Sequence, residues 1–333
     1  MRQLLATLLA VLFSGAPALV SAQGASPFAQ LETSLRALSL HAPGHVAMEI
    51  KDLGSGQAMS INANASMPAA STIKIPVMVE VFKQLEDGNF DLNTEVTLRA
   101  SDKDWGSGSL CDARSGTRYP VSQLLGAMIR VSDNTATNML IRMVGRTHIN
   151  ADMLNYGLEH TKLGDYIRSD GNGIRWALRS SPADMVSLLT QMANKELIDE
   201  WSSGEMIQIL EGQEHNSLIP EPLPDGVPIA HKTGTLHDTL NDVGIVFADP
   251  QPYVIAVMTT NLPSLYAGRR FIRSVSRMAY SQIEHFASIE GTQTQSGDWA
   301  APAQAGSDDT QTIIDGTGTP SSNQPAPEPT ATP

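Results

Sequence analysis

Three short motifs in this chain hold side chains that together could carry out nucleophilic chemistry. They are Ser71-Thr-Ile-Lys74, Ser132-Asp-Asn134 and Lys232-Thr-Gly234. In the first motif, a spacing of three residues puts a hydroxyl and an amine one turn apart on the same face of a helix. A serine hydroxyl is a weak nucleophile, but a nearby amine can take its proton when burial or a second cation lowers the pKa of that amine. The motif therefore predicts Ser71 as a nucleophile and Lys74 as its general base.

The second and third motifs supply groups that suit a peptide-like, anionic substrate. Ser132 can relay a proton to a leaving nitrogen, and Asn134 offers an amide to the side chain of the substrate. Lys232 supplies positive charge, Thr233 supplies a hydroxyl, and Gly234 lets a substrate approach the backbone closely. Each motif alone is also found at a helix start, a turn or a strand end. Together and in this order, they are typical of one group of serine enzymes.

The three motifs resemble those of the penicillin-recognising serine enzymes and, more specifically, those of the class A β-lactamase family. The supporting stretches are residues 69–74, 129–138 and 231–235. The resemblance extends over about residues 27–288 and implies the fold of that family. This fold is of the α/β (α+β) class and β-lactamase/transpeptidase-like: a five-stranded antiparallel sheet flanked by helices, a mainly helical subdomain, and the site between them.

The resemblance also implies a role for each motif residue. Ser71 would be acylated, while Lys74, Ser132 and Lys232 would shuttle protons and fix the substrate carboxylate. The backbone N–H groups of Ser71 and Thr235 would form the oxyanion hole, in which one donor is worth roughly 3–4 kcal/mol. The expected catalytic residues are therefore Ser71, Lys74, Ser132 and Lys232. The expected substrate-binding residues are Asn134, Thr233, Gly234 and Thr235.

One part of the family pattern is absent from this chain. In the family, a loop after Ser-Asp-Asn carries a Glu and, four residues on, an Asn, which hold the deacylating water. Here no Glu occurs between Glu159 and Glu196. Counting back from the next predicted helix points near Asp165, and residues 168–172 resemble a shortened loop that carries Asp170. Either Asp is a candidate deacylating acid, although Asp is one methylene shorter than Glu.

This gap leaves three functional hypotheses open. The leading one is a serine hydrolase that opens β-lactam rings and turns over. The second is a D,D-peptidase or esterase-like serine hydrolase that β-lactams acylate but leave slowly. The third is a β-lactam-binding sensor or wall-binding module without catalysis, which a transmembrane signalling segment would favour. All three expect a small-molecule β-lactam or a cell-wall-peptide-like ligand, and none needs a cofactor.

Hydrophobic periodicity predicts the elements that must position the motifs. Helices are predicted at 28–38, 71–85, 120–131, 135–144, 148–156, 182–194, 203–211 and 267–287. Strands are predicted at 46–50, 58–61, 227–230, 242–248 and 253–259. Because strands lie at both ends of the chain around a helical middle, we expect one antiparallel sheet assembled from both ends, plus a mainly helical subdomain.

One residue conflicts with the helix predicted at 71–85. Pro76 has no N–H to donate to the carbonyl of Thr72, four residues earlier, so a regular helix that begins at Ser71 would lack one hydrogen bond. We therefore expect either an irregular first turn or a helix that begins later than Ser71.

Composition limits the partners of this chain. Its 333 residues hold 22 Lys+Arg against 35 Asp+Glu, a formal net charge of −13. So acidic a chain is a poor partner for nucleic acid, whose phosphates need Lys and Arg. The single Cys excludes an internal disulfide, and no Cys/His cluster has the spacing of a structural zinc site, so no metal is expected.

The two ends of the chain differ from its middle. Residues 1–22 have the charged start, the interrupted apolar run and the small residues of a signal peptide. We therefore expect a periplasmic or secreted protein without stable membrane insertion. Residues 291–333 are rich in Thr, Pro and Gly and are expected to be disordered. The serine hydrolase domain is thus expected at residues 23–290, and we expect it to be a monomer.

Overall fold

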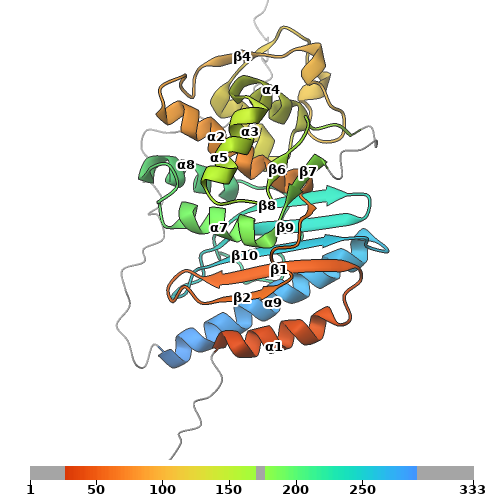
Figure 1. Ribbon diagram of the computed structural model, residues 1–333, viewed down its shortest axis with the longest axis vertical. Helices are drawn as coiled ribbons and strands as arrows, with labels where there is room; N and C mark the ends of the chain where they lie inside the picture. The colour runs from red at the N-terminus through yellow and green to blue at the C-terminus, as the bar shows by residue number, and fades with distance from the viewer. Residues whose placement is uncertain (1–26, 170–176, 291–333) are drawn as a thin grey trace, which may run out of the picture.

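The computed structural model describes residues 27–169 and 177–290. Within them, strands from both ends of the chain form one five-stranded sheet in the order β2-β1-β10-β9-β8, with every neighbouring pair antiparallel. The strands are β1 (His45–Asp52), β2 (Ala58–Ile61), β8 (Ile229–Leu236), β9 (Thr239–Val246) and β10 (Tyr253–Thr260). The structure confirms the predicted antiparallel sheet assembled from both ends of the chain (Figure 1).

The edge strand β8 carries the third motif. The strand predicted at 227–230 was too short and too early, since β8 continues to Leu236 through Lys232, Thr233 and Gly234. Apolar alternation ended the predicted strand at residue 230 because a Lys-Thr-Gly run has no apolar period, although the third motif itself was expected on a strand or at its end. The hydrogen-bond ladder with β9 extends the strand instead and pairs Lys232 with Val243.

Two helices from the ends of the described chain cover one face of the sheet (Figure 1). They are α1 (Pro27–Ser39) and α9 (Leu265–Glu290), as the apolar periodicity predicted. Their apolar faces form one core with the sheet, which includes Leu31, Leu35, Met48, Ile255, Ile272 and Val275. This core, as described, contains none of the motif residues, so its part in the site is to hold the sheet in place.

The helices from the middle of the chain form a second core on the other face. They are α2 (Lys74–Glu86), α3 (Val121–Arg130), α4 (Asn134–Val144), α5 (Arg146–Asn155), α7 (Pro182–Ala193) and α8 (Glu200–Glu211). All six helices were predicted. α8 begins three residues before its predicted start, because the Asp199 side chain caps it by accepting from the Ser202 N–H at 2.8 Å.

Several short strands were not predicted because two or three residues show no alternation. They are β3 (Met67–Pro68), β4 (Glu95–Thr97), β5 (Arg118–Pro120), β6 (Lys162–Leu163) and β7 (Leu178–Ser180). β3 leads directly into the nucleophile motif and pairs with β7. These strands therefore tie the chain before Ser71 to the chain before α7.

The helix predicted at 71–85 begins later. Residues Ala70–Ile73 form a 3-10 turn, η1, and the α-helix proper starts at Lys74. This places Pro76 in the first turn of α2, where a backbone N–H has no partner within the helix and its absence costs nothing. Both alternatives raised by Pro76 therefore occur together, an irregular first turn and a later start.

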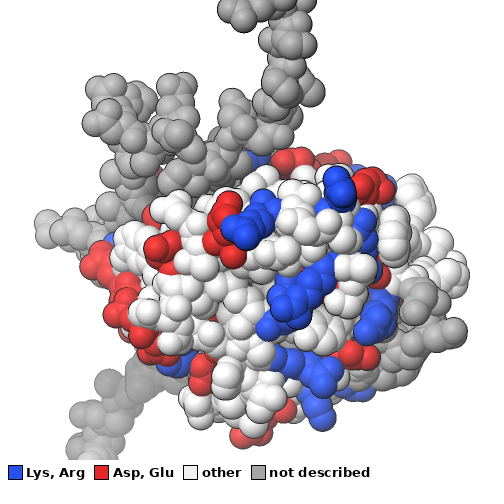
Figure 2. Space-filling model, turned by 90° about the horizontal axis from the view of Figure 1, so that it is seen from above, with Lys and Arg blue, Asp and Glu red and all other residues white. Residues whose placement is uncertain are grey.

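The surface is less uniform than the net charge suggests. Figure 2 shows the face over the helical part, where Lys and Arg side chains gather between acidic margins. Among the described residues, Arg118 pairs with Glu95 and Arg142 pairs with Asp102. No helix within residues 27–169 and 177–290 is long and apolar enough to cross a membrane.

Candidate active site

The three motifs meet where β8, η1 and the start of α4 come together. Lys74 Nζ donates to the Ser132 carbonyl at 2.7 Å, to Ser132 Oγ at 3.0 Å and to Asn134 Oδ1 at 2.8 Å. Lys232 Nζ donates to the same Ser132 Oγ at 3.1 Å. Both lysines are 0% exposed. One hydroxyl thus connects two buried amines that lie 158 positions apart in the sequence.

Burial changes the proton affinity of both amines. Desolvation and the neighbouring Lys232 hold the pKa of Lys74 well below its usual value, while Asp133 and Asp104 act in the opposite direction. Desolvation lowers the pKa of Lys232 to about 7, with Asp242 opposing it. Lys232 can therefore take and release protons near neutral pH, and Lys74 loses its proton more readily than an exposed lysine does.

Ser71 lies in the 3-10 turn and is partly exposed, unlike the lysines. A Cβ added to Gly234 would lie 2.8 Å from the Ala69 carbonyl and 3.2 Å from the Ser71 backbone nitrogen. The space left by this glycine is therefore filled by the protein's own backbone, so its absent side chain lets β8 pack against the nucleophile turn. Asn241 on β9 fixes the same turn, because its Nδ2 donates to the Ala69 carbonyl at 3.1 Å.

The second motif combines a strained residue with a helix cap. Ser132 has a φ of 58°, in the left-handed region that few non-glycine residues adopt. Asp133 caps α4 by accepting from the Ala136 N–H at 2.8 Å, and it also accepts from the N–H groups of Ser109 and Leu110 at 2.8 and 2.9 Å. The cap fixes the start of α4, so that Asn134 at its first residue and Ser132 just before the cap both reach Lys74.

Thr233 and Thr235, the threonines expected to bind substrate, differ in exposure. Thr233 is 7% exposed and pairs with Asp242 of β9, whereas Thr235, near the end of β8, is exposed. Because β8 is an edge strand, its outer side is not paired with another strand of this sheet. An extended backbone with an exposed Thr235 beside the nucleophile turn offers N–H groups to a ligand.

Of the two candidate deacylating acids, the structure describes the surroundings of only Asp165. The Asp165 carboxylate pairs with Arg146 at 3.4 Å, and within the described part of the chain no hydrogen bond joins it to a motif residue. Asp170 lies outside the described residues. The loop before it is fixed by Asn138, whose side chain bonds both the N–H and the carbonyl of Ile167, at 2.8 and 2.9 Å. This loop reaches the site at Ser169, whose hydroxyl accepts from Asn134 Nδ2 at 3.2 Å.

Sequence reasoning assigned no functional role to two acidic residues next to the site. Asp104 accepts from Asn134 Nδ2 at 2.7 Å, and nothing in its loop sequence distinguishes it from a solvated acid. Asp242 is fully buried, bonds His231 Nδ1 at 2.9 Å and accepts from the Ile219 N–H at 2.9 Å. Its signal in the sequence is an acid that enters an apolar strand, which indicates a paired buried charge.

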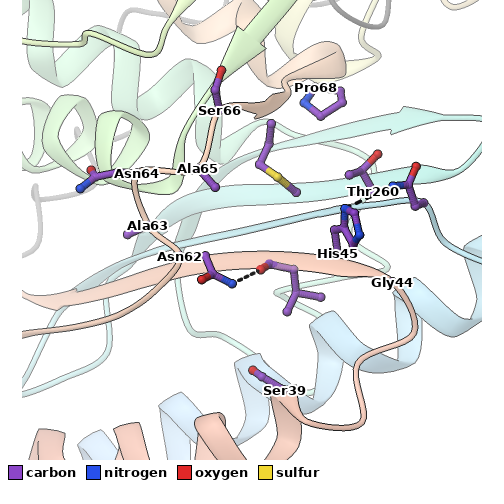
Figure 3. Close-up of a pocket in the computed structure, with 13 residues that line it drawn as sticks. Ser39, Gly44, His45, Asn62, Ala63, Asn64, Ala65, Ser66, Pro68 and Thr260 are labelled. Carbon is purple, nitrogen blue, oxygen red and sulfur yellow. Dashed lines mark hydrogen bonds between the residues drawn. The ribbon is translucent and has the colours of Figure 1, made fainter.

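A groove elsewhere on the molecule holds none of the motif residues. It lies between the start of β1, the end of β10 and the segment 62–68 (Figure 3). Its polar groups bond one another, as in the Asn62 Nδ2 bond to the Val46 carbonyl at 3.0 Å and the contact of Asn261 with His45. Among the described residues, no group of three His, Cys, Asp or Glu side chains could hold a metal ion.

Comparisons with known proteins agree with this geometry. The model of the beta-lactamase enzyme family matches residues 30–283. Beta-lactamase CARB-3 of Pseudomonas aeruginosa is 26% identical over 214 residues, which are 63% of this chain and 74% of that protein.

Two solved structures are similar to the fold described above. PBP-A has a TM-score of 0.72 and 30% identity, covering 77% of this chain and 96% of PBP-A. A leucine-to-glutamate variant of PBP-A, solved as an acyl-enzyme complex with penicillin G, is 29% identical. The beta-lactamase of Sphaerobacter thermophilus DSM 20745 has a TM-score of 0.71 and 29% identity, covering 76% of this chain and 97% of that one.

Proposed function

Because this chain belongs to the beta-lactamase enzyme family, we propose that it is a serine hydrolase that opens β-lactam rings through an acyl-enzyme on Ser71. The observation that carries the proposal is the hydrogen-bonded set Lys74–Ser132–Lys232 beside a partly exposed serine. Beta-lactamase CARB-3 and the penicillin acyl-enzyme of the PBP-A variant support β-lactams as the substrate class.

In the proposed acylation step, neutral Lys74 accepts the proton of the Ser71 hydroxyl as Oγ attacks the lactam carbonyl carbon. The ring C–N bond then breaks, Ser132 gives its proton to the departing nitrogen, and the Lys74 ammonium returns a proton to Ser132. The 3.0 Å distance from Lys74 Nζ to Ser132 Oγ supports this transfer. The lowered pKa of Lys74 supports its role as a base.

The third motif is proposed to bind the charged and polarised parts of the substrate. Lys232 would attract the substrate carboxylate, and Thr233 and Thr235 would add hydrogen bonds to the substrate. Asn134, from the second motif, would bind the amide of the substrate side chain. The Ser71 and Thr235 N–H groups would hold the oxyanion. The close packing of Gly234 on the Ser71 nitrogen supports this, because it draws the strand and the nucleophile turn together.

A second candidate function shares this acylation and differs in the rate at which the acyl-enzyme is hydrolysed. It is a D,D-peptidase or esterase-like hydrolase that β-lactams acylate and whose β-lactam acyl-enzyme is hydrolysed slowly. Two observations favour it: no Glu occurs between Glu159 and Glu196, and Asp165 pairs with Arg146 on the surface. A PBP-A variant, 29% identical to this chain, was solved as an acyl-enzyme complex with penicillin G, which supports an acyl-enzyme that persists.

A chromogenic β-lactam mixed with the purified full chain separates these functions. Sustained colour change supports a β-lactamase, and a burst of one equivalent followed by a plateau supports the slow enzyme. Ser71→Ala should abolish both signals, and mass spectrometry should show the acyl adduct on wild type alone. A signal that does not depend on Ser71 would overturn both, and no signal from wild type would leave only a non-catalytic binding module.

The deacylating acid can be tested in the same assay. If Asp165 or Asp170 activates the water, then Asp165→Asn or Asp170→Asn should accumulate the acyl-enzyme, because acylation does not need the acid. Normal turnover in both variants would exclude a loop acid as the base.

We also propose that residues 1–22 direct export, so that the enzyme acts in the periplasm or outside the cell as a monomer and gives resistance to β-lactams. The charged start and apolar run of this segment support export. Fractionation of cells, with N-terminal sequencing of the purified protein, checks it: an uncleaved cytoplasmic chain contradicts the proposal.

A further inference from the structure

Asp104 is a buried carboxylate, 7% exposed, in the loop after the short helix η2 (Ala100–Asp102). Its Oδ1 accepts from Asn134 Nδ2 at 2.7 Å, from the Ser169 hydroxyl at 2.6 Å and from the Gly106 N–H at 3.0 Å. Its Oδ2 accepts from the Ser169 N–H at 2.6 Å. One carboxylate therefore joins α4, the segment that includes Ser169 and its own loop.

The amide of Asn134 is held at both of its ends. Oδ1 accepts from Lys74 Nζ at 2.8 Å, and Nδ2 donates to Asp104 at 2.7 Å. A carboxylate only accepts, so a reversed amide would set its oxygen against Asp104, and it would set its N–H groups against Lys74 whenever that amine is protonated. Asp104 thereby selects the orientation in which Asn134 holds the lysine.

We propose that Asp104 is a positioning residue for acylation: it fixes the amide of Asn134 on Lys74 and fastens the loop at Ser169 to the site. The inference rests on the proposed function. It does not make Asp104 the deacylating base, because both of its oxygens already accept hydrogen bonds. Burial raises the pKa of this carboxyl, but the bonds from Ser169, Asn134 and Gly106 outweigh burial and lower it overall.

The charge of Asp104 gives the proposal a measurable signature. Three charged groups act on Lys74: Lys232 from β8, Asp133 from the start of α4 and Asp104 from its own loop. Burial and Lys232 lower the pKa of Lys74, whereas Asp133 and Asp104 raise it. Without the Asp104 charge, the pKa of Lys74 falls further, so the neutral amine forms at lower pH. The acid limb of the acylation profile should then move to lower pH.

The test measures the second-order rate constant for acylation of the full chain by penicillin G, between pH 5 and 9, with mass spectrometry of the adduct. Asp104→Asn puts an amide N–H among four donors, so we expect the rate constant at its optimum to fall about 10-fold or more, the scale of one lost charge-assisted hydrogen bond. We also expect its acid limb to lie at lower pH than that of wild type. In an Asn134→Ala background the same change should have little further effect on the rate, because Asp104 acts through Asn134.

Asp102→Asn is the matched control. Asp102 is also buried and lies two residues away, but its side chain pairs with Arg142 at 2.9 Å. The Asp102→Asn variant should be less stable than wild type, while the acid limb of its acylation profile stays at the wild-type pH. If Asp104→Asn does not fold, Asp104→Glu keeps the charge. Its acid limb should match wild type while its rate falls, and the fall should vanish in the Asn134→Ala background.

Three outcomes overturn the inference. One is a folded Asp104→Asn protein that is acylated at the wild-type rate with an unmoved acid limb. Another is an effect of Asp104→Asn or Asp104→Glu that persists undiminished in the Asn134→Ala background. The third is a wild-type chain that takes up no penicillin at Ser71, which overturns the proposed function as well and is thereby told apart from the first two.

Discussion

The Ser132 hydroxyl is where the two buried lysines meet, 3.0 Å from Lys74 Nζ and 3.1 Å from Lys232 Nζ. A hydroxyl has one proton and two lone pairs, so it can accept from two ammonium groups or donate to an amine that has lost its proton. Burial lowers the pKa of both lysines, to about 7 for Lys232, so the protonation state of Lys232 changes near neutral pH. At the residue scale, pH is therefore the variable that should control this site.

The lowered pKa of Lys232 leads us to expect an alkaline limit of activity. Its pKa of about 7 means that the ammonium is lost as pH rises, and with it the attraction for a substrate carboxylate. We expect kcat/KM for a carboxylate-bearing β-lactam to fall between pH 7 and 9, by at most about tenfold per pH unit.

Lys232→Arg is the comparison for this prediction. Arginine stays charged throughout this range, so any activity that the variant retains should not decline between pH 7 and 9. Stopped-flow measurement of kcat/KM across pH on both proteins checks it. Equal declines in the two proteins would assign the alkaline limit to another group.

At the scale of elements, the contact between β8 and η1 decides the geometry of the nucleophile. Gly234→Ala would place a Cβ 2.8 Å from the Ala69 carbonyl, closer than real Cβ contacts allow, so strand and turn must separate. We expect kcat/KM to fall about 100-fold or more, because the Ser71 N–H leaves its position. The free energy of unfolding should fall by about 1–3 kcal/mol.

Gly204→Ala is the matched control for this substitution. Gly204 lies in α8, and a Cβ there meets nothing within 4 Å. Alanine should leave activity unchanged and stabilise the helix by up to about 1 kcal/mol. Urea unfolding and steady-state kinetics on both variants measure these effects. A fully active Gly234→Ala protein would mean that the oxyanion site does not depend on this contact.

The position of Pro76 predicts a small effect from its removal. In the first turn of α2 the proline sacrifices no hydrogen bond, so Pro76→Ala should change the free energy of unfolding by less than about 1 kcal/mol. A proline placed later in the helix, as in Val79→Pro, should cost about 3 kcal/mol or more. Urea unfolding decides between them, and a gain of about 2 kcal/mol from Pro76→Ala would show that the native proline breaks a bond after all.

At the scale of the whole molecule, the site weakens the fold that holds it. A buried lysine whose folded pKa is about 7 binds its proton less tightly than in the unfolded chain. The unfolded chain therefore holds an extra proton between about pH 7 and 10, and the stability contributed by Lys232 rises with pH across that window and is lowest below it. Burial of charge for function is thus expected to cost stability at neutral pH.

Lys232→Met should expose this cost. We expect the variant to lose activity and to be more stable than wild type at pH 7 by roughly 1–4 kcal/mol, with the difference shrinking toward pH 10. The exposed Lys162→Met serves as control and should change little. Thermal unfolding at pH 7 and 9.5 measures it. A variant less stable than wild type at pH 7 would show that the bonds of Lys232 outweigh its desolvation.

Local features of the sequence are enough to specify the nucleophile motif, the antiparallel sheet and the order of the helices. These features are a fixed spacing along one helix, a period of two or 3.6 residues, and proline and cap signals. The later start of α2 also follows from one residue, because the missing N–H of Pro76 is a local property. The end of β8 does not follow from local features. The strand continues through Lys232 because it is hydrogen-bonded to β9, and no apolar pattern marks this part.

The surroundings of these groups depend on the tertiary structure alone. Asp104 and Asp165 look alike in sequence, as loop acids, yet Asp104 is buried on Asn134 and Asp165 pairs with Arg146 at the surface. The reason is that burial, and with it the pKa of a charge, depends on chain segments brought together from far apart. The sequence determines the types of the motif side chains, whereas the desolvation that lowers the pKa of Lys74 and Lys232 depends on the packing of β8 against the turn that holds Ser71.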